Sequence, residues 1–445
     1  MAQFYRQLRL LDLCRWSEVC FYSVVIKIEY LLKGFAVHKI VLRLMVSLTF
    51  VISFVGCSSN TKNSKAEPKW ISNMHQLSDV HSKLTPIVAD SKKFSDPDQK
   101  RAINENLKRM VEISAAIASD SRAPNADPLI GFNAQKLVSE VNEAYSAFQV
   151  QDLPRSQFAF SRISSSCISC HTRADRGFKD FPLPWENNIK SLSKIQRVEL
   201  MMANRQYKSA IAEAFDLASD PKVASQDPRA WLVTLERSLG LLIRVYKDPT
   251  QAEALVSYML KNKSAPFYVK SDAVAWQKDI KTWKTEKSRR KVENFDAAKK
   301  YFEQAAQAGP RDSVSLIKYL RASGILHELM ENTKSPQYAE YLLYSGMIAS
   351  SLKDLNQGYL DQYYYETCIM HEPHTDTSEK CYSLLEESVF ASNPFFQLNP
   401  SYNPQLAERL NTFRRQSRID YQIEEPLWMQ RDSQGEGQMG PGNSQ

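Results

Sequence analysis

Glycine is scarce in this chain, with 13 residues among 445. Together with the many Ala, Leu, Lys and Gln residues, this scarcity favours an all-α fold over a sheet protein. The sequence also lacks a glycine-rich phosphate loop, a catalytic triad and a pair of carboxylates at catalytic spacing. It therefore predicts a protein that is not an enzyme, and it identifies no small-molecule substrate.

A strong excess of charge of one sign is absent as well. The formal net charge is +7, but residues 1–56 hold seven Lys/Arg against three Asp/Glu, so the rest of the chain keeps only +3. Domains that bind nucleic acid usually show a pronounced basic excess. The charge balance thus gives no support to nucleic acid as a partner.

The apolar run Leu44–Val55 is too short to span a bilayer comfortably, since a membrane helix needs about 20 residues. It follows a basic segment, residues 39–43, and precedes Gly56-Cys57, which is the pattern of a secretory signal. The run Phe54-Val-Gly-Cys57 resembles the lipobox of bacterial lipoproteins. That resemblance implies that Cys57 is lipidated and that residues 57–66 form a linker behind a membrane anchor. A single membrane helix is the alternative.

A cleavage site after residue 56 lies late, because signal peptides usually have about 15–30 residues. Residues 1–56 are therefore interpreted as an upstream extension plus a lipoprotein signal peptide, with the real translation start near 37–45. Ser58 is not the aspartate associated with retention in the inner membrane. The resemblance to lipoproteins thus implies a periplasm-facing protein in the outer membrane rather than the inner membrane.

The most specific motif is Cys167-Ile-Ser-Cys170-His171. Its spacing is that of c-type haem attachment, in which both thiols bond the haem and the histidine is the proximal iron ligand. A zinc site would need a second cysteine pair, and Cys368 and Cys381 are distant and poorly spaced for it. A thioredoxin-like redox pair would need a β-α-β context, whereas both flanks here have a helical pattern. The motif therefore predicts one covalent haem c with its iron.

Residues 67–182 contain four segments whose apolar residues recur at helical spacing. The inward positions of the first three are Trp70, Met74, Leu77, Leu84, Val88, Ile103, Leu107, Met110, Ile117, Leu137, Val141, Tyr145 and Phe148. The fourth segment has Pro154 in its first turn and runs through Phe158 and Ile163 into the haem motif. Four helices with short connections predict a four-helix bundle.

A bundle with the haem motif near the end of its last helix resembles the class II cytochromes c, the cytochrome c-prime family. Thr85-Pro86 at the end of the first helix and the aromatic residues before the motif add to the resemblance. In that family the first helix crosses the distal face of the haem, and the distal position counted back from Thr85-Pro86 falls at Met74. The resemblance therefore implies Met74 as distal iron ligand, with His81 and His75 as alternatives and plain core packing as the simplest role for Met74.

Residues 188–430 form a longer helical region beyond the prolines at 182 and 184. Val198–Pro221 resembles one tetratricopeptide unit, Asn294–Pro310 a second, and residues 338–370 a further helix pair. Because the period is irregular, the region is predicted to be an α-solenoid of degenerate tetratricopeptide-like helix pairs, which docks a protein partner on its concave surface. A compact helical domain without a groove is the alternative. Residues 431–445 are predicted to be a disordered tail.

Cys368 and Cys381 flank a loop that carries His371 and His374. In an oxidising compartment a disulfide that staples the two flanking helices is the simplest interpretation. A metal site made by the two cysteines and the two histidines is the alternative.

These features predict a membrane-anchored, periplasm-facing monohaem cytochrome that transfers one electron at a time to or from a redox partner protein. Arg173 and Arg176, just after the motif, either pair with a haem propionate or lie at a solvated helix end. A haemoprotein that binds or senses small gases such as NO and CO is the first alternative function. A protein-assembly scaffold in which the haem is structural is the second.

Overall fold

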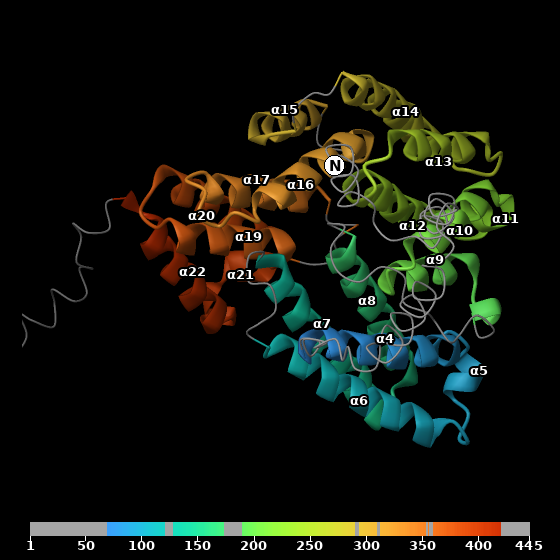
Figure 1. Ribbon diagram of the computed structural model, residues 1–445. Coiled ribbons are helices and arrows are strands. Elements are labelled where there is room, and N and C mark those ends of the chain that lie inside the picture. Colours follow the sequence, from blue (N-terminus) through green and yellow to red (C-terminus); the bar gives the residue numbers. More distant parts are fainter. Residues whose placement is uncertain are drawn as a thin grey trace, which may run out of the picture. The chain divides into compact units, whose positions relative to one another are not determined.

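The computed structural model describes residues 69–120, 128–172, 189–289, 293–308, 312–352, 355 and 359–419. Throughout these ranges the regular structure is helical, as the composition predicts (Figure 1). None of the helices in these ranges is long and apolar enough to cross a membrane. The predicted leader 1–56, the linker with Cys57, the arginines at 173 and 176, and the tail 431–445 lie outside the described residues.

Four long helices and one short helix make up the first part of the structure. They are α4 (Lys69–Val88), α5 (Ser91–Phe94), α6 (Lys100–Ala118), α7 (Pro128–Gln149) and α8 (Leu153–His171). Consecutive long helices pack against each other and share one hydrophobic core. The inward positions predicted for the second and third helices contribute to this core, fully or in part.

Local sequence signals set where these helices begin. The Asp90 carboxylate accepts hydrogen bonds from the amides of Lys92 and Lys93 at the start of α5, and the Asp152 carboxylate accepts one from the Arg155 amide in the first turn of α8. Pro154 stands in the first turn of α8, where no amide donor is needed. These caps satisfy amides that would otherwise lack a partner at a helix start.

Two details differ from the sequence prediction. Helix α4 does not close at Thr85-Pro86 but continues to Val88, because a proline in the last turn removes only one helical hydrogen bond. On α8 the predicted inward residue Phe158 is 63% exposed, whereas Phe160 is buried. Phe160 shares a face with Ile163 at helical spacing, and Phe158 lies about 200° around the helix from Phe160.

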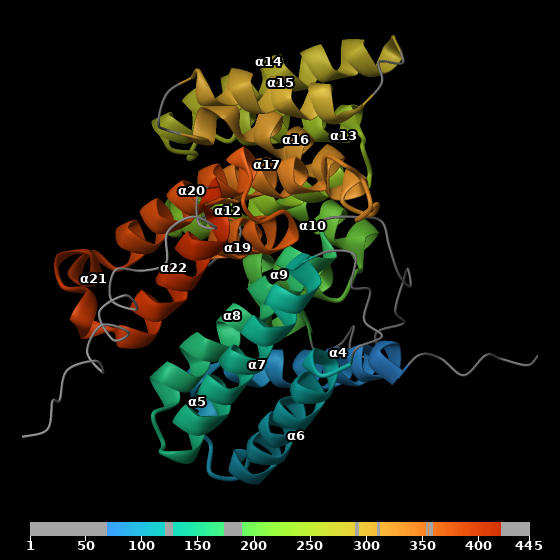
Figure 2. The same cartoon turned by 90° about the vertical axis from the view of Figure 1, so that its left-hand side faces the viewer.

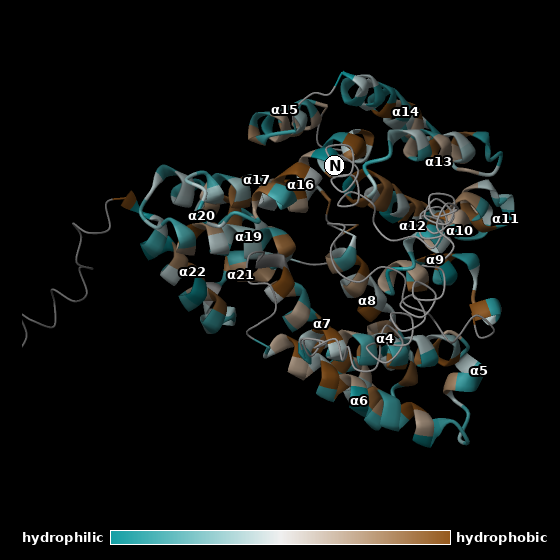
Figure 3. Ribbon diagram, in the orientation of Figure 1, coloured by the Kyte–Doolittle hydropathy of each residue, from teal (hydrophilic) through white to brown (hydrophobic). Residues whose placement is uncertain are grey.

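The rest of the described chain consists of further helices joined by short connections. They are α9 (Lys194–Ala203), α10 (Tyr207–Ser219), α11 (Pro221–Gln226), α12 (Pro228–Gly240), α13 (Pro249–Lys261), α14 (Phe267–Ser288), α15 (Phe295–Ala306), α16 (Leu316–Leu329), α17 (Tyr338–Ser351), α19 (Leu360–His371), α20 (Asp376–Ser392), α21 (Pro394–Leu398) and α22 (Pro404–Ser417). Pairs that follow one another in sequence lie side by side, such as α13 with α14 and α15 with α16 (Figure 2). Most of these helices are apolar on one side only, so Figure 3 shows brown and teal patches along the same ribbon.

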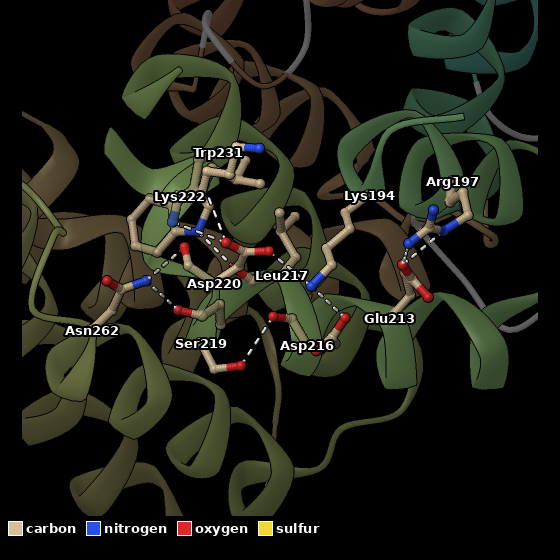
Figure 4. Close-up of polar contacts among 12 residues, drawn as sticks. Lys194, Arg197, Glu213, Asp216, Leu217, Ser219, Asp220, Lys222, Trp231 and Asn262 are labelled. Atoms are coloured by element: carbon tan, nitrogen blue, oxygen red, sulfur yellow. Dashed lines mark hydrogen bonds and ion pairs between the residues drawn. The ribbon is translucent and has the colours of Figure 1, made fainter. Parts of the chain in front are cut away.

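The segment predicted as the first tetratricopeptide-like unit folds as two packed helices, α9 and α10. Lys194 at the start of α9 reaches both Asp216 and Asp220 near the end of α10, at 2.7 and 2.8 Å (Figure 4). One turn further along α9, Arg197 pairs with Glu213. Ion pairs at both levels therefore fix the antiparallel alignment of α9 with α10.

Residues 294–310 differ from the expected second unit. The described part of this segment holds a single helix, α15, which Asn294 caps and which packs on α16. The segment is too short for two helices and a turn, so its alternation of aromatic and alanine residues reflects one amphipathic helix. The further helix pair matches better, since α17 and α19 fall within residues 338–371 and pack together.

Candidate functional site

The Cys167-Ile-Ser-Cys170-His171 motif occupies the last turn of α8. Cys167, Cys170 and His171 are all half-buried, and both cysteines carry thiols rather than a disulfide. Burial raises the pKa of the Cys167 thiol to about 12, so the sulfur is neutral. Cys167 packs against two hydrophobic cores, one formed by α4 to α8 and the other dominated by α9 to α22. The motif thus lies where these two cores meet on one helix.

Three consecutive serines directly before the motif tie α8 to three other helices. Ser164 shares a hydrogen bond of 3.0 Å with His81 on α4, and Ser165 accepts one of 3.1 Å from Arg237 on α12. Ser166 donates a hydrogen bond of 2.6 Å to the buried carboxylate of Glu140 on α7. Serine in a helix often bonds its own backbone. Here the serines fix the rotation of α8 and therefore the direction of the motif.

The imidazole of His171 has a defined orientation. Its Nδ1 lies 2.8 Å from the carbonyl oxygen of Ala203, and because that oxygen only accepts, Nδ1 must carry the proton. The lone pair of the neutral ring then lies on Nε2, the arrangement that histidine ligands of metals usually adopt. Burial, together with the nearby Arg205 charge, lowers the pKa of His171 to about 4. Tyr207 donates a second hydrogen bond of 2.7 Å to the His171 carbonyl oxygen.

Two side-chain contacts define the alignment of α4 with α8. Gln157 donates a hydrogen bond of 2.7 Å to the Val88 carbonyl, and His81 bonds Ser164 seven residues further along each helix. These contacts join the second half of α4 to residues 157–164 of α8. Met74 lies in the first half of α4, seven residues or about 10.5 Å along the helix before His81.

The three distal candidates on α4 have different surroundings. Met74 is half-buried and packs at the edge of the core of α4 to α8. His81 is 2% exposed, bonds Ser164 and stacks on Phe160 with ring centroids 5.3 Å apart. His75 is half-buried, and no solvent reaches its Nε2. Met74 is thus held less tightly than His81, which lies in a core contact two turns away.

The environment of His81 makes stability depend on pH. Burial lowers the pKa of His81 from 6.5 to about 4, so the folded protein resists a proton that the unfolded chain accepts. The contribution of His81 to the free energy of unfolding is complete above pH 6.5 and is lost as the pH falls toward 4. We expect the free energy of unfolding to fall by about 3 kcal/mol more in the wild type than in His81→Gln between pH 7 and 4.

Urea unfolding at several pH values measures this difference. Glutamine is the matched variant, because its amide can still bond Ser164 but does not titrate. Subtracting the two profiles removes the contribution of the carboxylates, which both proteins share. Parallel profiles would contradict the prediction.

Sequence reasoning missed the turn between α9 and α10 as a neighbour of the motif. Asn204 in this turn accepts hydrogen bonds from Ser78 and Ser82 of α4 through its side-chain oxygen. Its amide nitrogen donates to Leu200, which holds the side chain in place. Nothing in the spacing of residues 203–207 signals a contact with residues more than 30 positions away. The serines before Cys167 were visible as a run, but not as links between helices.

The second cysteine pair forms a disulfide between α19 and α20. The Cα atoms of Cys368 and Cys381 are 6.4 Å apart, and both side chains are fully buried. The His371 ring lies against Tyr338, and Nδ1 of His374 bonds the carbonyl of Arg418. Within the described ranges no group of three His, Cys, Asp or Glu side chains could hold a metal ion. The alternative of a metal site at this loop is therefore not supported, since both sulfurs are in the disulfide.

The residues at the end of α8 fit a covalently bound haem. They supply two thiols three residues apart and an imidazole whose Nδ1 proton is bound to Ala203, which leaves Nε2 as donor to iron. No known protein family, curated protein or solved structure matches this chain.

Proposed function

We propose that this protein is a membrane-anchored monohaem c-type cytochrome that transfers one electron at a time. The observation that carries the proposal is the hydrogen bond from His171 Nδ1 to the Ala203 carbonyl at the end of the Cys-x-x-Cys-His segment. This bond leaves the lone pair on Nε2, the arrangement in which histidine ligands of metals are usually held. The four helices α4, α6, α7 and α8 would then be a class II cytochrome bundle, as the resemblance implies.

Each residue of the site has a definite task. Cys167 and Cys170 would hold a haem by addition of their S–H bonds across its two vinyl groups, in which each sulfur bonds one carbon, the proton goes to the other, and no oxidant is needed. His171 would bind the iron through Nε2, and Met74, the distal position that the resemblance implies, would bind it through sulfur. A haem held there supplies the one-electron Fe(III)/Fe(II) couple. Two neutral ligands, histidine and methionine, favour the reduced form and suit electron transfer.

The rest of the chain positions the haem domain. Lipidation at Cys57 would hold the protein on the periplasmic face of the outer membrane, and helices α9 to α22, as tetratricopeptide-like pairs, would dock a redox partner protein. Support for an oxidising compartment comes from the buried disulfide between Cys368 and Cys381.

The test is to produce the chain in a bacterium that attaches haem to exported proteins. We expect haem that stays bound on a denaturing gel, and a visible spectrum that changes on reduction with one electron per protein. The double variant Cys167→Ser/Cys170→Ser loses the covalent haem. The matched double variant Cys368→Ser/Cys381→Ser, which removes two cysteines elsewhere, keeps it. A wild-type protein without covalent haem would overturn the proposal.

A further inference from the structure

The turn between α9 and α10 touches the haem motif from outside the helices α4 to α8. Ala203 and Tyr207 at the two ends of this turn both bond His171, and Asn204 bonds Ser78 on α4. The turn therefore contacts the helix that carries the proximal histidine and the helix that carries Met74. The side chain of one residue of the turn, Arg205, takes no part in these contacts.

The side chain of Arg205 has an unfavourable environment in the haem-free chain. Its backbone φ of 60° has a local explanation, because Arg205 follows the end of α9, where its own amide and that of Gln206 bond the carbonyls of Met202 and Met201 as in a Schellman motif. Its Nε and Nη2 atoms are enclosed and make no hydrogen bond within the described part of the chain. The guanidinium lies 5.7 Å from the centre of the Tyr207 ring, a contact that does not satisfy these donors. Buried donors without acceptors cost free energy, so their retention indicates a missing acceptor.

The chemistry of the missing acceptor follows from the guanidinium. Its planar fork of N–H donors matches the two oxygens of a carboxylate, and the pair gains further strength where water is excluded. Arg205 stands in the turn between Ala203 and Tyr207, the two residues that bond His171. A group bound to the motif would therefore lie near Arg205. The propionates are the carboxylates that a haem carries.

We propose that Arg205 binds a propionate of the haem attached to Cys167 and Cys170, so that the α9–α10 turn completes the haem site. The inference rests on the proposed function and deepens it. It assigns to a residue 34 positions beyond His171 the task that the sequence suggested for the arginines at 173 and 176. It also makes the tetratricopeptide-like region part of the haem environment and not only a docking surface.

The test compares Arg205→Gln and Arg205→Lys with Lys208→Gln in the haem-loaded full chain. Lys208→Gln is the matched control, because the Lys208 side chain is exposed and its replacement removes the same charge three residues away from Arg205. Reduction adds an electron near the guanidinium, so loss of Arg205 should disfavour the reduced form. We expect Arg205→Gln to lower the reduced-to-oxidised ratio at fixed potential about tenfold, which is 59 mV for one electron. Arg205→Lys should recover part of this change, and Lys208→Gln should stay within about threefold of the wild type.

A second readout separates a direct contact from a general effect of charge. The propionate bending band in the resonance Raman spectrum should shift in Arg205→Gln and stay unchanged in Lys208→Gln. If Arg205→Gln and Lys208→Gln behave alike in both measurements, the inference about Arg205 is wrong while the cytochrome stands. If the wild type carries no covalent haem, the proposed function itself fails.

Discussion

Replacement of Met74 by alanine should convert the haem iron from a six-coordinate low-spin state to a five-coordinate high-spin state that binds carbon monoxide. The reason is the proposed role of Met74 as distal ligand: its side chain is half-buried at the edge of the core of α4 to α8, and it carries the only sulfur of α4. In the wild type carbon monoxide must displace the methionine. Without that competition its apparent affinity should rise at least about tenfold, or roughly 1.4 kcal/mol. The reduction potential should fall, because the methionine ligand raises it.

Visible spectra of the oxidised and reduced protein, with and without carbon monoxide, measure all of these changes. His81→Ala is the matched control, because it removes the competing candidate from the same face of α4. It should leave a six-coordinate low-spin spectrum. If His81→Ala changes the spin state and Met74→Ala does not, His81 is the ligand and α4 must shift when haem binds. A wild-type spectrum that is already five-coordinate would favour gas binding over electron transfer.

Much of the arrangement near the motif was predictable because it depends on local periodicity. The apolar stripe that contains Met74 and His81, and the proline that opens α8, are properties of neighbouring residues. Cys167, Cys170 and His171 likewise lie within about one helical turn, so their spacing can be read from the sequence. Such features need no knowledge of which helices pack together.

The partners of the motif were not predictable, because they come from distant segments. Ser165 reaches Arg237, and His171 reaches Ala203, across separations of 72 and 32 residues. A serine run or an arginine in a left-handed turn carries no sequence signal for its partner. Phe158 and Phe160 show the same limit on a smaller scale, since both are aromatic and only the packing of α4 on α8 decides which one is buried.

Replacement of Trp231 by alanine should cause a large loss of stability in the second part of the structure. Trp231 on α12 is fully buried, and its indole N–H donates a hydrogen bond of 2.9 Å to the Leu217 carbonyl in the last turn of α10 (Figure 4). Truncation leaves a large cavity and removes one of the two hydrogen bonds that the Leu217 carbonyl accepts, the other coming from the Asp220 amide. We expect the free energy of unfolding to fall by about 3–5 kcal/mol.

Two further variants separate packing from the hydrogen bond in this prediction. Trp231→Phe keeps an aromatic ring and loses the hydrogen bond to the Leu217 carbonyl, which still accepts from the Asp220 amide, so it should cost about 0.5–1.5 kcal/mol. Phe267→Ala removes an aromatic ring that is 88% exposed, and its effect should stay within about 0.5 kcal/mol. Urea unfolding followed by circular dichroism gives the three values, and a loss below 1 kcal/mol in Trp231→Ala would contradict the prediction.

The Trp231→Ala variant also tests how far the proposed haem site depends on the core of α9 to α22. Helix α12 carries both Trp231 and Arg237, and Arg237 holds Ser165 on α8 and Glu199 on α9. Loosening of α12 should therefore reach α8 through Arg237 and the α9–α10 turn through Glu199. We expect the haem spectrum of Trp231→Ala to change at a lower urea concentration than that of the wild type, together with the helical signal. A haem spectrum that persists after the helical signal of α9 to α22 is lost would show instead that α4 to α8 hold the haem on their own.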